Sequence, residues 1–305
     1  MPCAPRRRKP ARSCTATGGC WPLSPPMTRT ISCSMTRSWS TDCRAAMAGM
    51  RIAALGTGPS GARAGESACS DRLPPVAEVV QAAAAAKRLE RALDDTGADI
   101  AIIGRVGADL SRHGVTWTHA GIAWRDDPAG RWQIRHALNE RAGPTSRLYR
   151  QGLMNFFLDG PWTYDALVLV PGPELRAGLL ERLEAGSIET LHQPRYSVMA
   201  YPFAMAYQNS NQFVLENLAL ARAGRLDGDR AAAIAELRQS GFEPHTVCFT
   251  RLERLGGRFR ANVRFDDHPR AAANDNRYAV VTVQAIERWL ASTGTLSASI
   301  EVRPQ

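Results

Sequence analysis

Regular hydrophobic patterning begins at Leu73 and continues to the C-terminus. The stretch PVAEVVQAAAAAKRLERALDDTG is rich in Ala, Leu, Glu and Arg and ends at Gly97, which predicts a long amphipathic helix. The next segment, ADIAIIGRVG, is an apolar and β-branched run that predicts a strand.

Two apolar runs, VTWTHAGIAW and RWQIRHALNE, flank the turn sequence DDPAG and predict a β-hairpin. With the turn centred on Asp127 and Pro128, paired residues have numbers that sum to 255. His119 then lies directly opposite His136, and the two imidazoles share one face of the sheet. A register shift of one residue would place the two rings on opposite faces.

The remaining pattern predicts further strands and helices in the same region of the chain. We expect strands at 164–171, 245–250, 260–267 and 299–304, and helices at 173–186, 228–241 and 282–294, the last capped by Thr282. Segregated helices and an antiparallel sheet predict an α+β fold, with residues 65–305 forming a single domain.

A cluster of small polar residues precedes one more predicted helix, which runs from about Ser210 to Arg222 in the stretch YQNSNQFVLENLALAR. A helix N-terminus offers unpaired N–H groups and the positive end of the dipole, which can activate a nucleophile. Four polar residues lie at this position: Gln208, Asn209, Ser210 and Asn211. The simpler interpretation is that Asn209 or Ser210 only caps the helix.

The histidines of the hairpin also have two interpretations. His119 lies in an otherwise apolar strand next to Ala120 and Gly121, so it can serve as a catalytic base with His136 as the residue that orients it. Alternatively, each is a core histidine that hydrogen-bonds to the backbone. A zinc site would need a third ligand, for which only Glu216 or His245 could converge, so we predict neither a metal nor a cofactor.

These motifs resemble the permuted branch of the papain-like NlpC-type hydrolases, which includes the lecithin–retinol acyltransferase-like proteins. The shared features are H-x-G-I on a strand, a second His on the next strand and a polar helix start about seventy residues later. The resemblance implies a papain-like fold with His119 as base, His136 as orienting residue and Ser210 at the nucleophile position. The hydrolases have Cys where this chain has Ser210, and a hydroxyl depends more on a well-placed base than a thiol does.

Most of 73–305, and above all 105–124 and 207–219, also resembles an uncharacterised bacterial, exported family, a domain of unknown function. We therefore expect a hydrolase or acyl transferase acting on an amide, ester or thioester in the cell envelope. The alternative is a catalytically inactive relative that binds a peptide or envelope ligand in the same groove, with Gln208, Asn209 and Asn211 as binding residues. A structural envelope protein is a third class.

The excess positive charge of the chain belongs to its N-terminal part. Met1 to Ala64 holds ten of the 38 Lys and Arg residues and one of the 29 acids, which leaves 28 of each in the remainder. A neutral body without a basic run argues against nucleic-acid binding. Residues 1–46 lack hydrophobic periodicity, which predicts a disordered segment or an over-extended gene start.

Residues 47–64 contain a basic residue, a short apolar patch and the triplet Ala62-Arg63-Ala64, features of a signal peptide. We expect a periplasmic or secreted protein, with a cytoplasmic one as the alternative, and no stretch is long enough for a membrane span. After export, Cys69 and Cys248 could form a disulfide; in the cytosol, Cys248 would be a small core residue. The oligomeric state and the substrate stay open.

Overall fold

The structure, a computed structural model, describes residues 66–67, 73–257 and 259–304. The predicted N-terminal extension (1–46), the predicted signal peptide (47–64) and Cys69 lie outside the described residues.

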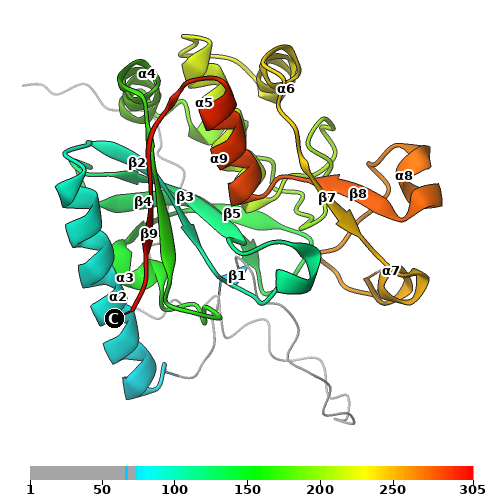
Figure 1. The fold of residues 1–305 in the computed structure, drawn as a ribbon, viewed down its shortest axis with the longest axis horizontal. Helices are drawn as coiled ribbons and strands as arrows, with labels where there is room; N and C mark the ends of the chain where they lie inside the picture. The colour runs from blue at the N-terminus through cyan, green and yellow to red at the C-terminus, as the bar shows by residue number, and fades with distance from the viewer. Residues whose placement is uncertain (1–65, 68–72, 258, 305) are drawn as a thin grey trace, which may run out of the picture. The chain divides into compact units, whose positions relative to one another are not determined.

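The described chain is a mixed α+β structure built on a seven-stranded sheet (Figure 1). The strand order is β1-β4-β3-β2-β6-β9, and β5 pairs with β4. All pairs are antiparallel except β1 with β4. The strands are β1 (Glu66–Ser67), β2 (Ile100–Arg105), β3 (His119–Trp124), β4 (Gln133–Glu140), β5 (Ser146–Gly152), β6 (Ala166–Pro171) and β9 (Leu296–Val302).

A second sheet has two antiparallel strands, β7 (His245–Cys248) and β8 (Arg277–Val280). The α-helices are α2 (Val76–Asp95), α3 (Leu153–Phe156), α4 (Pro173–Glu184), α5 (Ser210–Arg222), α6 (Arg230–Gln239), α7 (Arg251–Gly257), α8 (Arg270–Asp275) and α9 (Val283–Ser292). Short 3-10 helices are η1 (Ser111–His113) and η2 (Glu189–Leu191). None of the helices in the described ranges combines the length and the apolar character that crossing a bilayer requires.

Most of the long periodic segments form the predicted elements. Helix α2 ends two residues before Gly97, which has a φ of +65° and suits a helix end. Helix α5 begins at Ser210 and ends at Arg222. Helix α9 has Thr282 as its N-cap, and the Thr282 side chain accepts a hydrogen bond from Ala285 N. The predicted antiparallel sheet packed with helices is therefore confirmed.

Two local predictions are wrong. Residues 260–267 form no strand, because they make isolated hydrogen bonds in place of the regular pairing of a sheet. Val198 N donates to Asn262 O, and Arg264 N donates to the Ser197 hydroxyl. Cys248, expected in the core if the protein is cytosolic, is instead exposed at the end of β7.

The β3–β4 hairpin forms in a different register from the predicted one. Ile122 pairs with Arg135 and Trp124 with Gln133, so paired numbers sum to 257 rather than 255. The turn starts at Asp127: its carboxylate accepts from Ala129 N and its carbonyl accepts from Gly130 N, which makes Pro128 the second residue of the turn. A register shift of two residues leaves every side chain on the same face of the sheet. The two histidines therefore still share one face, although they are not directly opposite each other.

The sheet separates two hydrophobic cores. On one face, Ala101, Ile103 and Ala123 pack with helices α2 and α3, through side chains such as Leu89 and Phe156. On the other face, alternate residues of the same strands pack with α4, α5, α6 and α9; this core includes Ile102, Ile122, Leu179, Phe213, Leu237 and Trp289. Strand alternation therefore decides which helices a given side chain can reach.

A third, smaller core lies between the two-stranded sheet and the chain around α7 and α8. Its buried residues are Met199, Val247, Val263, Tyr278 and Val280. Figure 1 shows β7, β8, α7 and α8 grouped at one end of the described structure. We call this group, residues 245–280, the C-terminal lobe.

Candidate functional site

The two hairpin histidines form a direct contact. His119 Nε2 lies 2.8 Å from His136 Nδ1, and His136 Nε2 lies 3.1 Å from Gln151 Oε1. An amide oxygen only accepts, so His136 donates through Nε2 and receives the Nε2–H of His119 at its Nδ1. The predicted shared face is confirmed.

The environment of this pair keeps both rings neutral. Burial, reinforced by the positive charge of Arg105, holds the pKa of His119 well below its usual value of 6.5. The same causes lower the pKa of His136 to about 3. His119 Nδ1 has a free lone pair, but it is buried without a hydrogen-bond partner, and the whole residue has no exposed surface. A substrate has no access to this base in the described conformation.

An ion pair and an aromatic ring enclose the histidines. Arg105 binds both carboxylate oxygens of Asp159, at 2.5 and 2.6 Å. The Arg105 guanidinium also lies 5.0 Å from the centre of the Phe156 ring, which contacts both histidine rings at 5.7 and 5.4 Å. The pair therefore belongs to a buried polar cluster under helix α3.

His119 and Ser210 form no hydrogen bond with each other in the described structure. His119 points to the face covered by α3, whereas α5, which begins at Ser210, packs on the opposite face through Phe213. The Ser210 side chain instead bonds to the buried Tyr196 phenol. Burial raises the pKa of that phenol. This separation arises because successive side chains of β3 point to opposite faces of the sheet, and it does not depend on the register of the hairpin.

The polar residues at the start of α5 are used by the fold. Asn209 is the N-cap and accepts from Gln212 N at 2.8 Å, as the simpler interpretation predicts. Asn211 donates to the carbonyls of Thr118 and Val281, which ties the helix start to two other segments.

Gln208 belongs to a buried ionic network. Its amide donates to Glu216 at 2.6 Å, and Gln212 donates to the same carboxylate at 3.0 Å. Arg230 contacts Glu216 through Nε and Nη2 at 2.8 to 3.1 Å. Burial raises the pKa of Glu216, and the Arg230 contacts oppose that rise. These partners satisfy the carboxylate within the fold.

No group of three metal-binding side chains lies together among the residues that the structure describes. Of the two side chains that could have supplied a third zinc ligand, Glu216 is bound by Arg230, and His245 Nε2 contacts His113 O at 2.8 Å. They are engaged away from the histidine pair.

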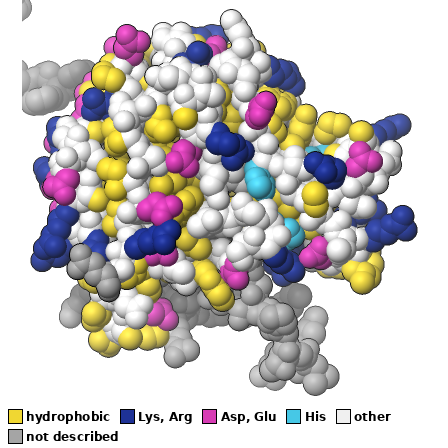
Figure 2. All heavy atoms as spheres, in the orientation of Figure 1, with side chains coloured by type: hydrophobic (Ala, Val, Ile, Leu, Met, Phe, Trp, Pro, Cys, Tyr) yellow, Lys and Arg dark blue, Asp and Glu magenta, His cyan; other side chains and the backbone are white. Residues whose placement is uncertain are grey.

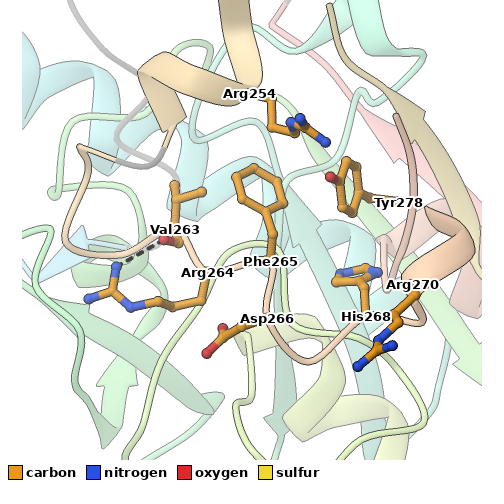
Figure 3. A pocket seen from close by; sticks show the side chains of 8 residues that line it. All are labelled: Arg254, Val263, Arg264, Phe265, Asp266, His268, Arg270 and Tyr278. Atoms are coloured by element: carbon orange, nitrogen blue, oxygen red, sulfur yellow. Dashed lines mark hydrogen bonds between the residues drawn. The ribbon is translucent and has the colours of Figure 1, made fainter. Parts of the chain in front are cut away.

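An open pocket of about 400 Å³ lies in the C-terminal lobe (Figure 3). Three arginines line it: Arg254 from α7, Arg264 from the segment between the helices, and Arg270 at the start of α8. Arg264 donates to the carbonyl of Val263, and neither Arg264 nor Arg270 forms an ion pair with a carboxylate of the described residues. We call this cavity the arginine pocket.

The other wall of the arginine pocket is aromatic. The Phe265 and Tyr278 rings lie 4.7 Å apart, and His268 packs edge-on against Tyr278 at 5.0 Å. The His268 side chain is 1% exposed; its Nε2 donates to Met199 O, while its Nδ1 has no partner. Asp266 is the one acid of the lining and accepts from the Tyr207 hydroxyl. The lining thus joins basic side chains with aromatic rings.

This pocket was not predicted from the sequence, because only the net charge of all residues after Ala64, which is zero, was considered. Residues 251–270 hold six arginines and three acids, an excess that the neutral total conceals. The local charge count was the signal available in the sequence.

A protein-family model matches residues 92–290, and its family is described as an uncharacterized protein conserved in bacteria (DUF2145). Comparisons with curated proteins and with solved structures give no match.

Proposed function

The chain belongs to the DUF2145 family, and we propose that it is an exported, non-catalytic protein that binds a small ligand through an oxyanion group in the arginine pocket. The observation that carries the proposal is that three arginines line one open cavity, and that two of them, Arg264 and Arg270, have no carboxylate partner in the described chain. Guanidinium groups bind phosphate and carboxylate oxygens through paired N–H donors.

The aromatic wall supports a ligand that is more than an inorganic ion. Phe265 and Tyr278 offer ring faces to an apolar or sugar-like part, while Asp266 can accept a hydrogen bond from a hydroxyl. The volume of about 400 Å³ suits a small organic molecule. The ligand class is therefore an organic phosphate or carboxylate.

The hydrolase alternative has weaker support. Its base and orienting residue are in contact, but Ser210 begins a helix on the opposite face of the sheet and bonds to Tyr196. A serine needs a base within about 3.2 Å for proton transfer. The papain-like relationship therefore stays a prediction, and binding without catalysis is the function that the geometry favours.

Isothermal titration calorimetry with glycerol 3-phosphate and with succinate tests the binding function, with glycerol as the uncharged control. We expect saturable binding of at least one of the two anions. Arg264→Gln and Arg270→Gln should each weaken it by about tenfold or more, since a charge-assisted hydrogen bond contributes about 1.5 to 3 kcal/mol.

Arg147→Gln is the matched control, because Arg147 is also an exposed arginine, at 59%, but lies on β5 and outside the pocket lining. Equal binding of glycerol and the anions, or an equal loss in the Arg147 variant, would show that the pocket is not the site. A fluorophosphonate probe should leave Ser210 unlabelled, and a Ser210 adduct would restore the hydrolase interpretation.

A further inference from the structure

Next to the arginine pocket, which Arg254 of α7 lines, the C-terminal lobe exposes three large apolar side chains. Leu252 is 81% exposed, Leu255 52% and Phe259 84%. Leu252 and Leu255 are three residues apart on α7, so they share one side of the helix, and Phe259 follows two residues after its end. We call these three residues the docking surface.

Basic side chains flank the docking surface. Arg251 and Arg260 are exposed and form no ion pair with a carboxylate of the described chain. The one acid of α7, Glu253, is neutralised by Arg112 at 3.2 Å and by hydrogen bonds from Thr250. Figure 2 shows basic and hydrophobic side chains beside one another at the end that carries α7 and α8.

A second exposed apolar stripe has no basic side chain beside it among the residues that the structure describes. Leu73, Val76 and Val80, at the start of α2, are 72%, 79% and 61% exposed. The acid in the first turn of that helix is Glu78, and its sequence has no basic residue before Lys87. Exposed apolar side chains therefore occur at both places, and the docking surface differs from the start of α2 in the arginines beside it.

We propose that the docking surface binds an anionic phospholipid membrane, with Leu252, Leu255 and Phe259 entering the headgroup and acyl boundary and the flanking arginines contacting lipid phosphates. Apolar side chains beside Arg residues are the pattern of interfacial membrane binding, in which burial and electrostatic attraction act together. An acidic protein partner would bind the arginines, but it would not account for two leucines and a phenylalanine that are each more than half exposed. The inference goes beyond the proposed function, because it needs no ligand in the arginine pocket.

Cosedimentation with lipid vesicles tests the inference. The full chain should bind vesicles of equal parts phosphatidylglycerol and phosphatidylcholine, and bind pure phosphatidylcholine at least about tenfold more weakly, because each nearby arginine contributes about fivefold on an anionic surface. Leu252→Ser/Phe259→Ser should reduce binding to the anionic vesicles by about tenfold or more.

Val76→Ser/Val80→Ser is the matched control, since it removes the same number of exposed apolar side chains from the start of α2, where Glu78 is the charged residue of the first turn. It should bind vesicles like the unchanged chain. Circular dichroism and the melting temperature verify that both variants fold, as expected for substitutions at exposed positions.

Three results would overturn the membrane proposal: no binding to anionic vesicles, equal losses in the two double variants, or equal binding to both vesicle types. Stronger binding to poly-glutamate than to vesicles would instead identify an acidic polypeptide as the partner. Glycerol 3-phosphate titrated into Leu252→Ser/Phe259→Ser separates the two proposals. If this double variant still binds glycerol 3-phosphate but no longer binds vesicles, both proposals are supported. If the unchanged chain binds glycerol 3-phosphate but no vesicles, the membrane proposal is refuted and the proposed ligand binding is not.

Discussion

Acid should destabilise this protein through its buried histidine pair. In the unfolded chain both imidazoles titrate near 6.5, whereas in the folded protein the pKa of His136 is about 3 and that of His119 is well below 6.5. Between these values the unfolded chain binds protons that the folded protein does not. The free energy of unfolding therefore falls as the pH drops below about 6.5, and the contribution of His136 is exhausted only near pH 3.

The magnitude follows from the two pKa values. Well below pH 6.5, His136 contributes about 1 kcal/mol per pH unit, and His119, whose pKa is also lowered, adds to the slope in the same direction. For His136 alone, the full range from 6.5 to about 3 corresponds to about 5 kcal/mol. Both rings are fully buried, so solvent screens this contribution little.

Urea denaturation of the chain and of His119→Leu/His136→Leu, between about pH 5 and pH 7.5, measures the difference. The double variant removes both partners of the His119–His136 hydrogen bond, which avoids leaving one buried polar atom unpaired. From pH 7.5 to pH 5 its unfolding free energy should fall less than that of the unchanged chain, by about 2 kcal/mol for His136 and by a further amount of the same sign for His119. His192, with a pKa of about 4, is present in both proteins and cancels. Equal slopes would show that water reaches the rings and that the cluster is open.

Three further substitutions test parts of the fold by chemical denaturation. Asn209→Ala should cost about 1 kcal/mol, because it removes the N-cap of α5, and Asn209→Asp should cost little; equal costs would argue against capping. Glu216→Ala should cost about 3 to 5 kcal/mol, because it leaves the buried Arg230 charge unpaired, and an unchanged stability would mean that water enters this network. Gly121→Ala should destabilise the sheet, since a Cβ there would lie 2.5 Å from a methyl group of Ile134, whereas Gly256→Ala, with open space around it, should not; similar effects would contradict the packing of β3 on β4.

Local sequence signals predicted the long elements well, because these depend on periodicity and caps. Helix α5 begins at Ser210 as expected, since Asn209 is a good cap and an apolar stripe follows it. The weakly patterned 260–267 segment was misread as a strand because alternation does not reveal whether a partner strand exists. Its Val263 and Phe265 pack into the lobe core without a ladder.

The candidate site was less predictable, because it depends on which side of the sheet each helix packs. Local pairing placed His119 and His136 together, and an error of two residues in the register did no harm. The meeting of His119 with Ser210 required a long-range choice between two faces, and hydrophobic periodicity does not make that choice. The arginine pocket likewise forms only when residues from α7, α8 and β8 fold together.

The central claim is that this protein binds an oxyanion in the arginine pocket and performs no chemistry at the start of α5. Amide chemical-shift mapping by NMR, during titration with glycerol 3-phosphate, tests it most directly. The claim predicts saturable shifts for the amides of Arg264, Phe265 and Arg270, with those of Ser210 and His119 unmoved. Shifts centred on Ser210, or release of glycerol during the titration, would contradict it.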